Sequence, residues 1–107
     1  MRKLKIKDGV SLAGLKKEMR IAIIEADDIY RAHGKELWIT EYMGGEHSPR
    51  SLHYGGYALD MRTKFFGVAE AQVVAKKLQE ALGDDYDVVL HTTHLHVEYD
   101  PKEKQHD

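Results

Sequence analysis

Residues 86–99 read YDVVLHTTHLHVEY, and this stretch predicts two strands joined by a short turn. Val, Leu and Tyr favour β-structure, so we expect strands at 86–90 and 94–99. In the second strand polar residues occupy alternate positions, namely His94, His96 and Glu98. Side chains two residues apart in a strand project from the same face. The stretch therefore predicts a strand with one apolar face toward a core and one polar face.

A third predicted strand, residues 57–62 (YALDMR), shows the same alternation. Ala58, Asp60 and Arg62 share one of its faces, while the larger apolar residues share the other. Asp60 is therefore expected to point away from the aliphatic core. Upstream, residues 37–42 (LWITEY) are rich in β-forming residues and predict another strand.

Two helices are predicted where apolar residues recur every three or four positions. The first spans about residues 12–33, with Ser11 as its expected N-cap and Gly34 after its end. The second spans residues 68–82 and is followed by Gly83. Residues 43–54 are then expected to form a loop, and the charged residues after Pro101 a frayed end.

This order of elements predicts an α+β fold, with two helices on one face of a small, mostly antiparallel sheet. The opposite face is free to carry a site. With 107 residues, the chain is expected to form a single domain, residues 1–107.

Composition excludes several classes of function. Sixteen Lys and Arg against 18 Asp and Glu give a net charge of −2, so nucleic acid is not an expected partner. No apolar run is long enough for a membrane helix, so no membrane role is expected. The basic start, residues 1–7, is followed by Asp8 and Gly9 rather than by an apolar segment, so we predict no signal peptide. The chain has no cysteine, and any metal must be held by nitrogen and oxygen.

Histidines are the most informative residues. Five of the seven lie in two short segments: His47, His53, His91, His94 and His96. Residues 51–60 (SLHYGGYALD) contain one of these histidines, His53, in a loop that leads into the strand carrying Asp60. With one histidine of the His94/His96 pair, His53 and Asp60 would give three N/O ligands, the number that catalytic zinc sites use. The alternative is that His53 is a turn residue and Asp60 an isolated carboxylate, although such an acid needs a charge partner.

Residues 51–60 match the S-x-H-x-x-G-x-A-x-D pattern of the peptidase family M15 (LAS-type) zinc metallopeptidases, and His94-Leu95-His96 resembles their closing H-x-H. This group includes D-alanyl-D-alanine peptidases, murein endopeptidases and the hedgehog domain. The resemblance spans about residues 37–99. It implies a hedgehog/D-Ala-D-Ala peptidase-like fold, a Zn²⁺ cofactor held by His53, Asp60 and His96, and peptidoglycan stem peptides or muropeptides as substrates.

The resemblance also suggests catalytic residues, with one departure. Many members carry an acidic general base just before the last ligand, but residues 90–93 contain His91 and no acid. The murein endopeptidases are similar in carrying H-x-x-H-x-H. By this resemblance His91 is the base that activates a zinc-bound water, His94 steadies the oxyanion and His47 lines the cleft. A neutral imidazole suits proton transfer near pH 7. Alternatively, His91 is a solvated residue at a strand end and His47 an inert loop residue.

A second departure concerns substrate recognition. Carboxypeptidase-like members usually show an S-G-Y-R segment whose arginine engages the substrate, but residues 40–43 read TEYM. A D-Ala-D-Ala carboxypeptidase is therefore not the preferred interpretation. Arg50 or Arg62 could meet a substrate carboxylate, or either could be a solvated cation.

The sequence thus predicts an endolysin-like zinc metallopeptidase that degrades the cell wall, either an endopeptidase or a carboxypeptidase. We expect a monomer that is cytoplasmic or phage-encoded and reaches the wall by other means. One alternative is a catalytically inactive hedgehog-like domain that binds zinc for a structural or partner-binding role. Another is a small domain without metal, in which the histidine cluster is coincidental.

Overall fold

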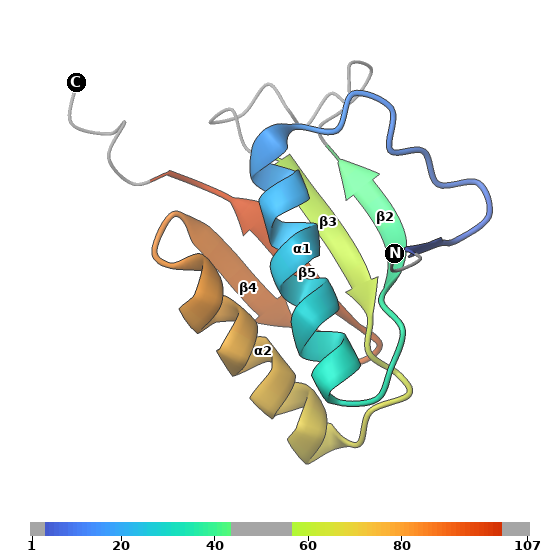
Figure 1. The fold of residues 1–107 in the computed structure, drawn as a ribbon, viewed down its shortest axis with the longest axis vertical. Coiled ribbons are helices and arrows are strands. Elements are labelled where there is room, and N and C mark those ends of the chain that lie inside the picture. The colour runs from blue at the N-terminus through green and yellow to red at the C-terminus, as the bar shows by residue number, and fades with distance from the viewer. Residues whose placement is uncertain (1–3, 44–56, 102–107) are drawn as a thin grey trace.

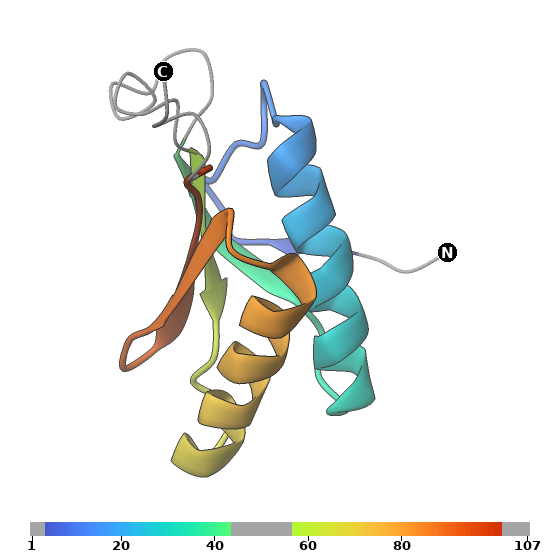
Figure 2. The ribbon, with the colours of Figure 1, turned by 90° about the vertical axis from the view of Figure 1, so that its left-hand side faces the viewer.

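The computed structural model describes residues 4–43 and 57–101. Within them the chain forms a five-stranded sheet and two helices (Figure 1). The elements are β1 (Lys5–Ile6), α1 (Lys17–Ala32), β2 (Trp38–Met43), β3 (Tyr57–Arg62), α2 (Val68–Leu82), β4 (Tyr86–Leu90) and β5 (His94–Tyr99). Both helices pack on the same face of the sheet, as the side view in Figure 2 shows, and the described residues leave the other face uncovered. The predicted α+β class, with a mostly antiparallel sheet, is confirmed.

The sheet has the strand order β1-β2-β3-β5-β4, and all its pairings except β1 with β2 are antiparallel. Strand β3 is central, between β2 and β5. Its register with β5 places Asp60 opposite His96 and Arg62 opposite His94. Because residues in register share a face, these polar side chains from distant parts of the sequence gather on the helix-free face.

The core lies between the sheet and the helices. Strands β3 and β5 contribute fully buried residues at the positions that alternate with the polar ones: Leu59, Met61, Leu95 and Val97. Tyr30 of α1 is also fully buried, and its hydroxyl donates a hydrogen bond of 2.8 Å to the Arg62 carbonyl. Burial of each such aliphatic side chain stabilises the fold by about 1.5–3 kcal/mol. The apolar alternation therefore fixes which face of β3 carries Asp60.

Four predicted elements have the bounds found in the structure: the strands at 57–62, 86–90 and 94–99 and the helix at 68–82. The prediction that Asp60 points away from the core is also correct, because its neighbours Leu59 and Met61 are fully buried. These elements were predictable because each has an unbroken period, of two residues for strands and of about 3.6 for the helix.

The prediction for the first helix was wrong at its start. Helix α1 begins at Lys17, and Ser11 does not cap it, since its hydroxyl oxygen accepts a hydrogen bond from the Ala13 N–H instead. Gly14, with φ of 73°, interrupts the chain before the helix. Leu12 and Leu15 continue the apolar pattern because they pack against the core from a non-helical segment. Apolar spacing alone could not distinguish residues of a helix from residues of a non-helical segment that packs against the same core.

Strand β2 is displaced by one residue from the predicted 37–42, and Met43 belongs to it rather than to the loop. The register between β2 and β3 shifts between Ile39 and Glu41, which is a β-bulge at Thr40. Strand β1 was not predicted, because two residues give no periodic pattern. The rest of the predicted 43–54 loop and the tail after Pro101 lie outside the described residues.

The outer edge of β4 is covered by a side chain from α2. The Gln79 amide nitrogen donates a hydrogen bond of 2.7 Å to the Tyr86 carbonyl, and its oxygen accepts one of 2.9 Å from the Val88 N–H. An edge strand whose backbone groups are paired in this way is a poor template for another chain. Neither helix of the described chain is long and apolar enough to cross a membrane.

Candidate metal centre

Asp60 and His96 form the centre of the polar face. They are cross-strand partners on β3 and β5, and Asp60 Oδ1 lies 2.9 Å from His96 Nδ1. A carboxylate can only accept hydrogen bonds, so the imidazole donates through Nδ1. Both side chains are partly buried, with 20% of Asp60 and 25% of His96 exposed. The aspartate thus has the charge partner that its position in an apolar strand requires.

A second carboxylate approaches the other ring nitrogen of His96. Glu98, two residues further along β5, places Oε1 3.2 Å from His96 Nε2. The pKa of His96 is raised, chiefly by the hydrogen bond to Asp60 and secondarily by Glu98, while partial burial acts in the opposite direction. The imidazole is therefore held between two acids that favour a cation at its position.

His94 and His91 lie next to this pair. His94 Nε2 is 3.8 Å from Asp60 Oδ2, and the ring of His91 stacks on that of His94 with centroids 4.8 Å apart. The His91 ring also meets His96 edge-on at 6.4 Å. The backbone N–H of His91 donates to the His94 carbonyl at 2.8 Å, which closes the β4–β5 turn. This turn brings together all three histidines of the second segment.

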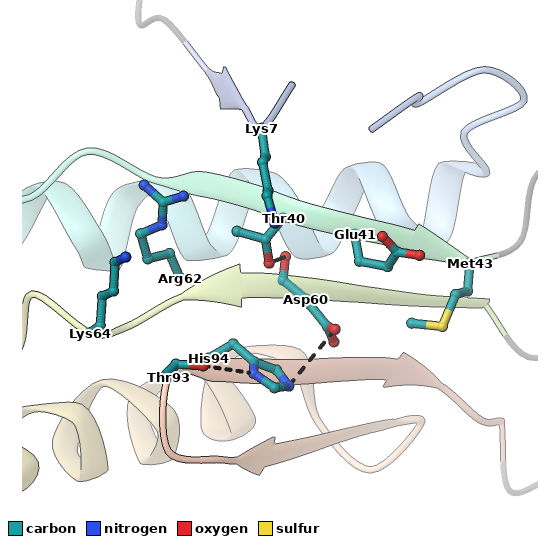
Figure 3. A pocket seen from close by; sticks show the side chains of 9 residues that line it. All are labelled: Lys7, Thr40, Glu41, Met43, Asp60, Arg62, Lys64, Thr93 and His94. Atoms are coloured by element: carbon teal, nitrogen blue, oxygen red, sulfur yellow. Dashed lines mark hydrogen bonds and ion pairs between the residues drawn. The ribbon is translucent and has the colours of Figure 1, made fainter. Parts of the chain in front are cut away.

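A groove of about 580 Å³ runs along this face, and Figure 3 shows the side chains that line it. Arg62 and Lys64 lie toward one end of it, Glu41 and Met43 lie toward the other, and Asp60 lies between them. Thr40, at the bulge of β2, fixes the floor by donating from its hydroxyl to the Asp60 carbonyl at 3.3 Å. The groove is therefore charged, with cations at one end and carboxylates toward the other.

Of the predicted zinc ligands, Asp60 and His96 are brought together, while His53 lies outside the described residues. The same holds for His47, one of the three predicted catalytic residues; His91 and His94 lie beside the Asp60–His96 pair. Among residues 4–43 and 57–101, no group of three His, Asp or Glu side chains is arranged to hold a metal ion.

The two described donors fit a zinc ion in chemistry and in spacing. Imidazole nitrogen and carboxylate oxygen are common zinc ligands, and tetrahedral coordination separates two of them by about 3.3 Å. The observed 2.9 Å between Asp60 and His96 is close to that separation.

Sequence reasoning did not find several residues that line the groove: Lys7, Thr40, Glu41 and Lys64. Lys7 follows the unpredicted strand β1, and Thr40 lies on the groove face because it alternates with the buried Ile39. Strict alternation would put Glu41 on the same face as Ile39, and the bulge instead brings it to the groove, opposite Asp60 in the register. Comparison of the chain with protein-family models, curated proteins and solved structures gives no match.

Proposed function

We propose that this chain is a zinc-dependent peptidase that hydrolyses peptide bonds in peptidoglycan stem peptides, with His53, Asp60 and His96 as zinc ligands. The observation that carries the proposal is the 2.9 Å contact between Asp60 and His96 on two central strands. Two of the three ligands implied by the M15 resemblance are 36 residues apart in sequence and meet as cross-strand neighbours. The proposal requires this contact between Asp60 and His96, and neither the 51–60 motif nor the His94-Leu95-His96 motif implies it alone.

A bound zinc ion would supply a Lewis acid that polarises the scissile carbonyl and lowers the pKa of water to about 7. The chain's own residues would supply the proton transfers and the hydrogen bond to the oxyanion. His91 is exposed, so its imidazole is free to take a proton from water and to pass it to the leaving amine. His94, with Nε2 3.8 Å from Asp60, is near enough to the ligand pair to donate a hydrogen bond to an oxyanion formed there.

The fold supports this role because Asp60, His94 and His96 stand on paired strands and His91 stands at the turn between β4 and β5. Side chains on paired strands are held by the register and by the buried residues behind them, Leu59, Met61 and Leu95 among them. Fixed positions of this kind are what proton transfer and oxyanion binding require.

The test is incubation of the zinc-loaded full chain with purified muropeptides, followed by mass spectrometry. Products that differ from the substrate by hydrolysis of one peptide bond are expected, and a matched sample of the His96→Ala variant should give none. His33→Ala is the control, because His33 pairs with Glu70 at 2.9 Å and not with the site. Zinc binding without any turnover would contradict the peptidase and identify a non-enzymatic zinc domain of the hedgehog kind.

A further inference from the structure

One end of the groove concentrates positive charge. Arg62 and Lys64 line it, and we call these two residues the cationic end, while Lys7 lies over Thr40 nearer the middle of the groove (Figure 3). Among the residues that the structure describes, no carboxylate forms an ion pair with Arg62 or Lys64. Two neighbouring cations without an acidic partner at one end of a groove produce a positive potential that an anion can neutralise.

Arg62 is held in place at this end by an aromatic ring. Its guanidinium carbon lies 4.7 Å from the centre of the Trp38 ring, on the neighbouring strand β2. Stacking of this kind leaves the planar N–H donors of arginine free at their edge, where they match a carboxylate. A fixed guanidinium also loses less conformational entropy on binding than a solvated side chain does. Arg62 therefore has the arrangement of a binding residue rather than that of a solvated cation.

The cationic end is close to the candidate metal centre. Arg62 follows Asp60 by two positions on the same face of β3, which is about 7 Å along a strand. It also lies opposite His94 in the register of β3 and β5. An extended peptide covers the same distance in roughly two residues.

We propose that the cationic end binds a carboxylate of the substrate roughly two residues from the cleaved bond, so that the protein selects acidic peptides. This inference rests on the proposed peptidase function and adds the substrate class. It gives Arg62 the recognition role for which the TEYM segment at residues 40–43 offers no arginine. Electrostatic recognition at a partly open groove should weaken as the salt concentration rises.

The chain contains a natural fluorescent reporter of carboxylate binding at the cationic end. It has a single tryptophan, Trp38, which is the residue stacked on Arg62. An anion that binds the guanidinium should change the fluorescence of Trp38. Isothermal titration calorimetry would give the same affinity by an independent signal.

The experiment uses the zinc-loaded full chain and four forms of one stem tetrapeptide that carries an internal and a C-terminal carboxylate. The forms are unmodified, amidated at either position, and amidated at both. Kd is measured from the change in Trp38 fluorescence, extrapolated to the moment of mixing so that cleavage does not affect it. The value of kcat/KM is measured by following product formation with mass spectrometry. We expect amidation of one particular carboxylate to raise Kd and to lower kcat/KM, each about tenfold, which is the usual effect of losing a charged hydrogen bond.

Variants assign the effect to the cationic end. In Arg62→Gln the preference for the free carboxylate should disappear, and in the exposed Lys64→Gln it should shrink. Arg20→Gln is the matched control, because Arg20 is exposed on α1, which lies on the other face of the sheet. A guanidinium that merely supports the fold would weaken binding of all four peptides equally when replaced, and that result would overturn the proposal.

The two proposals fail separately. Equal Kd and kcat/KM for all four peptides in the wild type would overturn the carboxylate subsite and leave the peptidase. Carboxylate-dependent binding that disappears in Arg62→Gln, without cleavage of any peptide, would support the subsite and overturn the peptidase.

Discussion

Asp60 and His96 lie directly opposite each other on β3 and β5, and their side chains meet with 2.9 Å between Oδ1 and Nδ1. The pair stands at the midpoint of both strands, with fully buried residues on either side of each partner. Its geometry is therefore set by the sheet and not by a loop. Substitutions at this pair should change the chemistry of the face while the core behind it stays intact.

The first prediction concerns zinc content. The protein purified without chelator should hold about one zinc ion per chain, and Asp60→Ala or His96→Ala should lose it, because two remaining ligands bind zinc too weakly. Inductively coupled plasma mass spectrometry of the purified proteins provides the measurement. His33→Ala should retain the metal. Full zinc occupancy in both ligand variants would remove Asp60 and His96 from the ligand set.

The second prediction concerns His91, whose exposed ring stacks on His94. His91→Ala should keep zinc near one ion per chain and lower kcat by about a hundredfold or more, the usual contribution of a general base. Zinc content and muropeptide turnover are measured on the same preparation. Turnover near that of the wild type in a zinc-replete variant would show that His91 is not the base, and Glu98 or His94 would then be examined.

The third prediction concerns the hydrogen bonds of Gln79 to the edge strand β4. Gln79→Met keeps the length of the side chain but leaves the Tyr86 carbonyl and the Val88 N–H without their partner. We expect the free energy of unfolding to fall by about 1–3 kcal/mol and aggregation to increase, because β4 becomes an open edge. Urea denaturation and light scattering measure the two effects. Gln72→Met, at an exposed position of the same helix, should change neither.

The fourth prediction concerns stability at alkaline pH. Burial, followed by the nearby charges of Glu18, Tyr99 and Asp85, raises the pKa of Tyr86 to about 12. The folded state therefore holds the phenol proton more tightly than the unfolded chain, in which the pKa is about 10. This stabilisation is fully present below about pH 10 and is lost as pH rises from about 10 to 12.

Urea denaturation between about pH 8 and 11.5 tests this. Tyr86→Phe should lower stability at pH 8 by about 1 kcal/mol, because the hydrogen bond of the hydroxyl to the Glu18 carbonyl is lost. The variant should then lose less stability than the wild type as the pH rises. Parallel pH profiles for the two proteins would contradict a raised pKa at Tyr86. Tyr30, whose pKa burial also raises, adds a similar contribution to both proteins.

Much of the fold was determined by the sequence alone, and the reason is local. Strand β5 alternates His94, Leu95, His96 and Val97, and only one of its two faces could be buried. The same logic fixed the outward direction of Asp60 on β3 and the bounds of α2. Periodic segments are predictable because side-chain direction follows from backbone geometry within the segment.

The tertiary structure determined which residues of different elements become neighbours. The pairing of Asp60 with His96, and the stacking of Arg62 on Trp38, join residues from different strands whose register no local pattern records. Leu12 and Leu15 belong to the core without belonging to α1, and Lys7 reaches the groove through a two-residue parallel strand. These relationships depend on long-range packing and on the β2 bulge, because the free energy that fixes them comes from contacts between elements and not from the propensity of any one element.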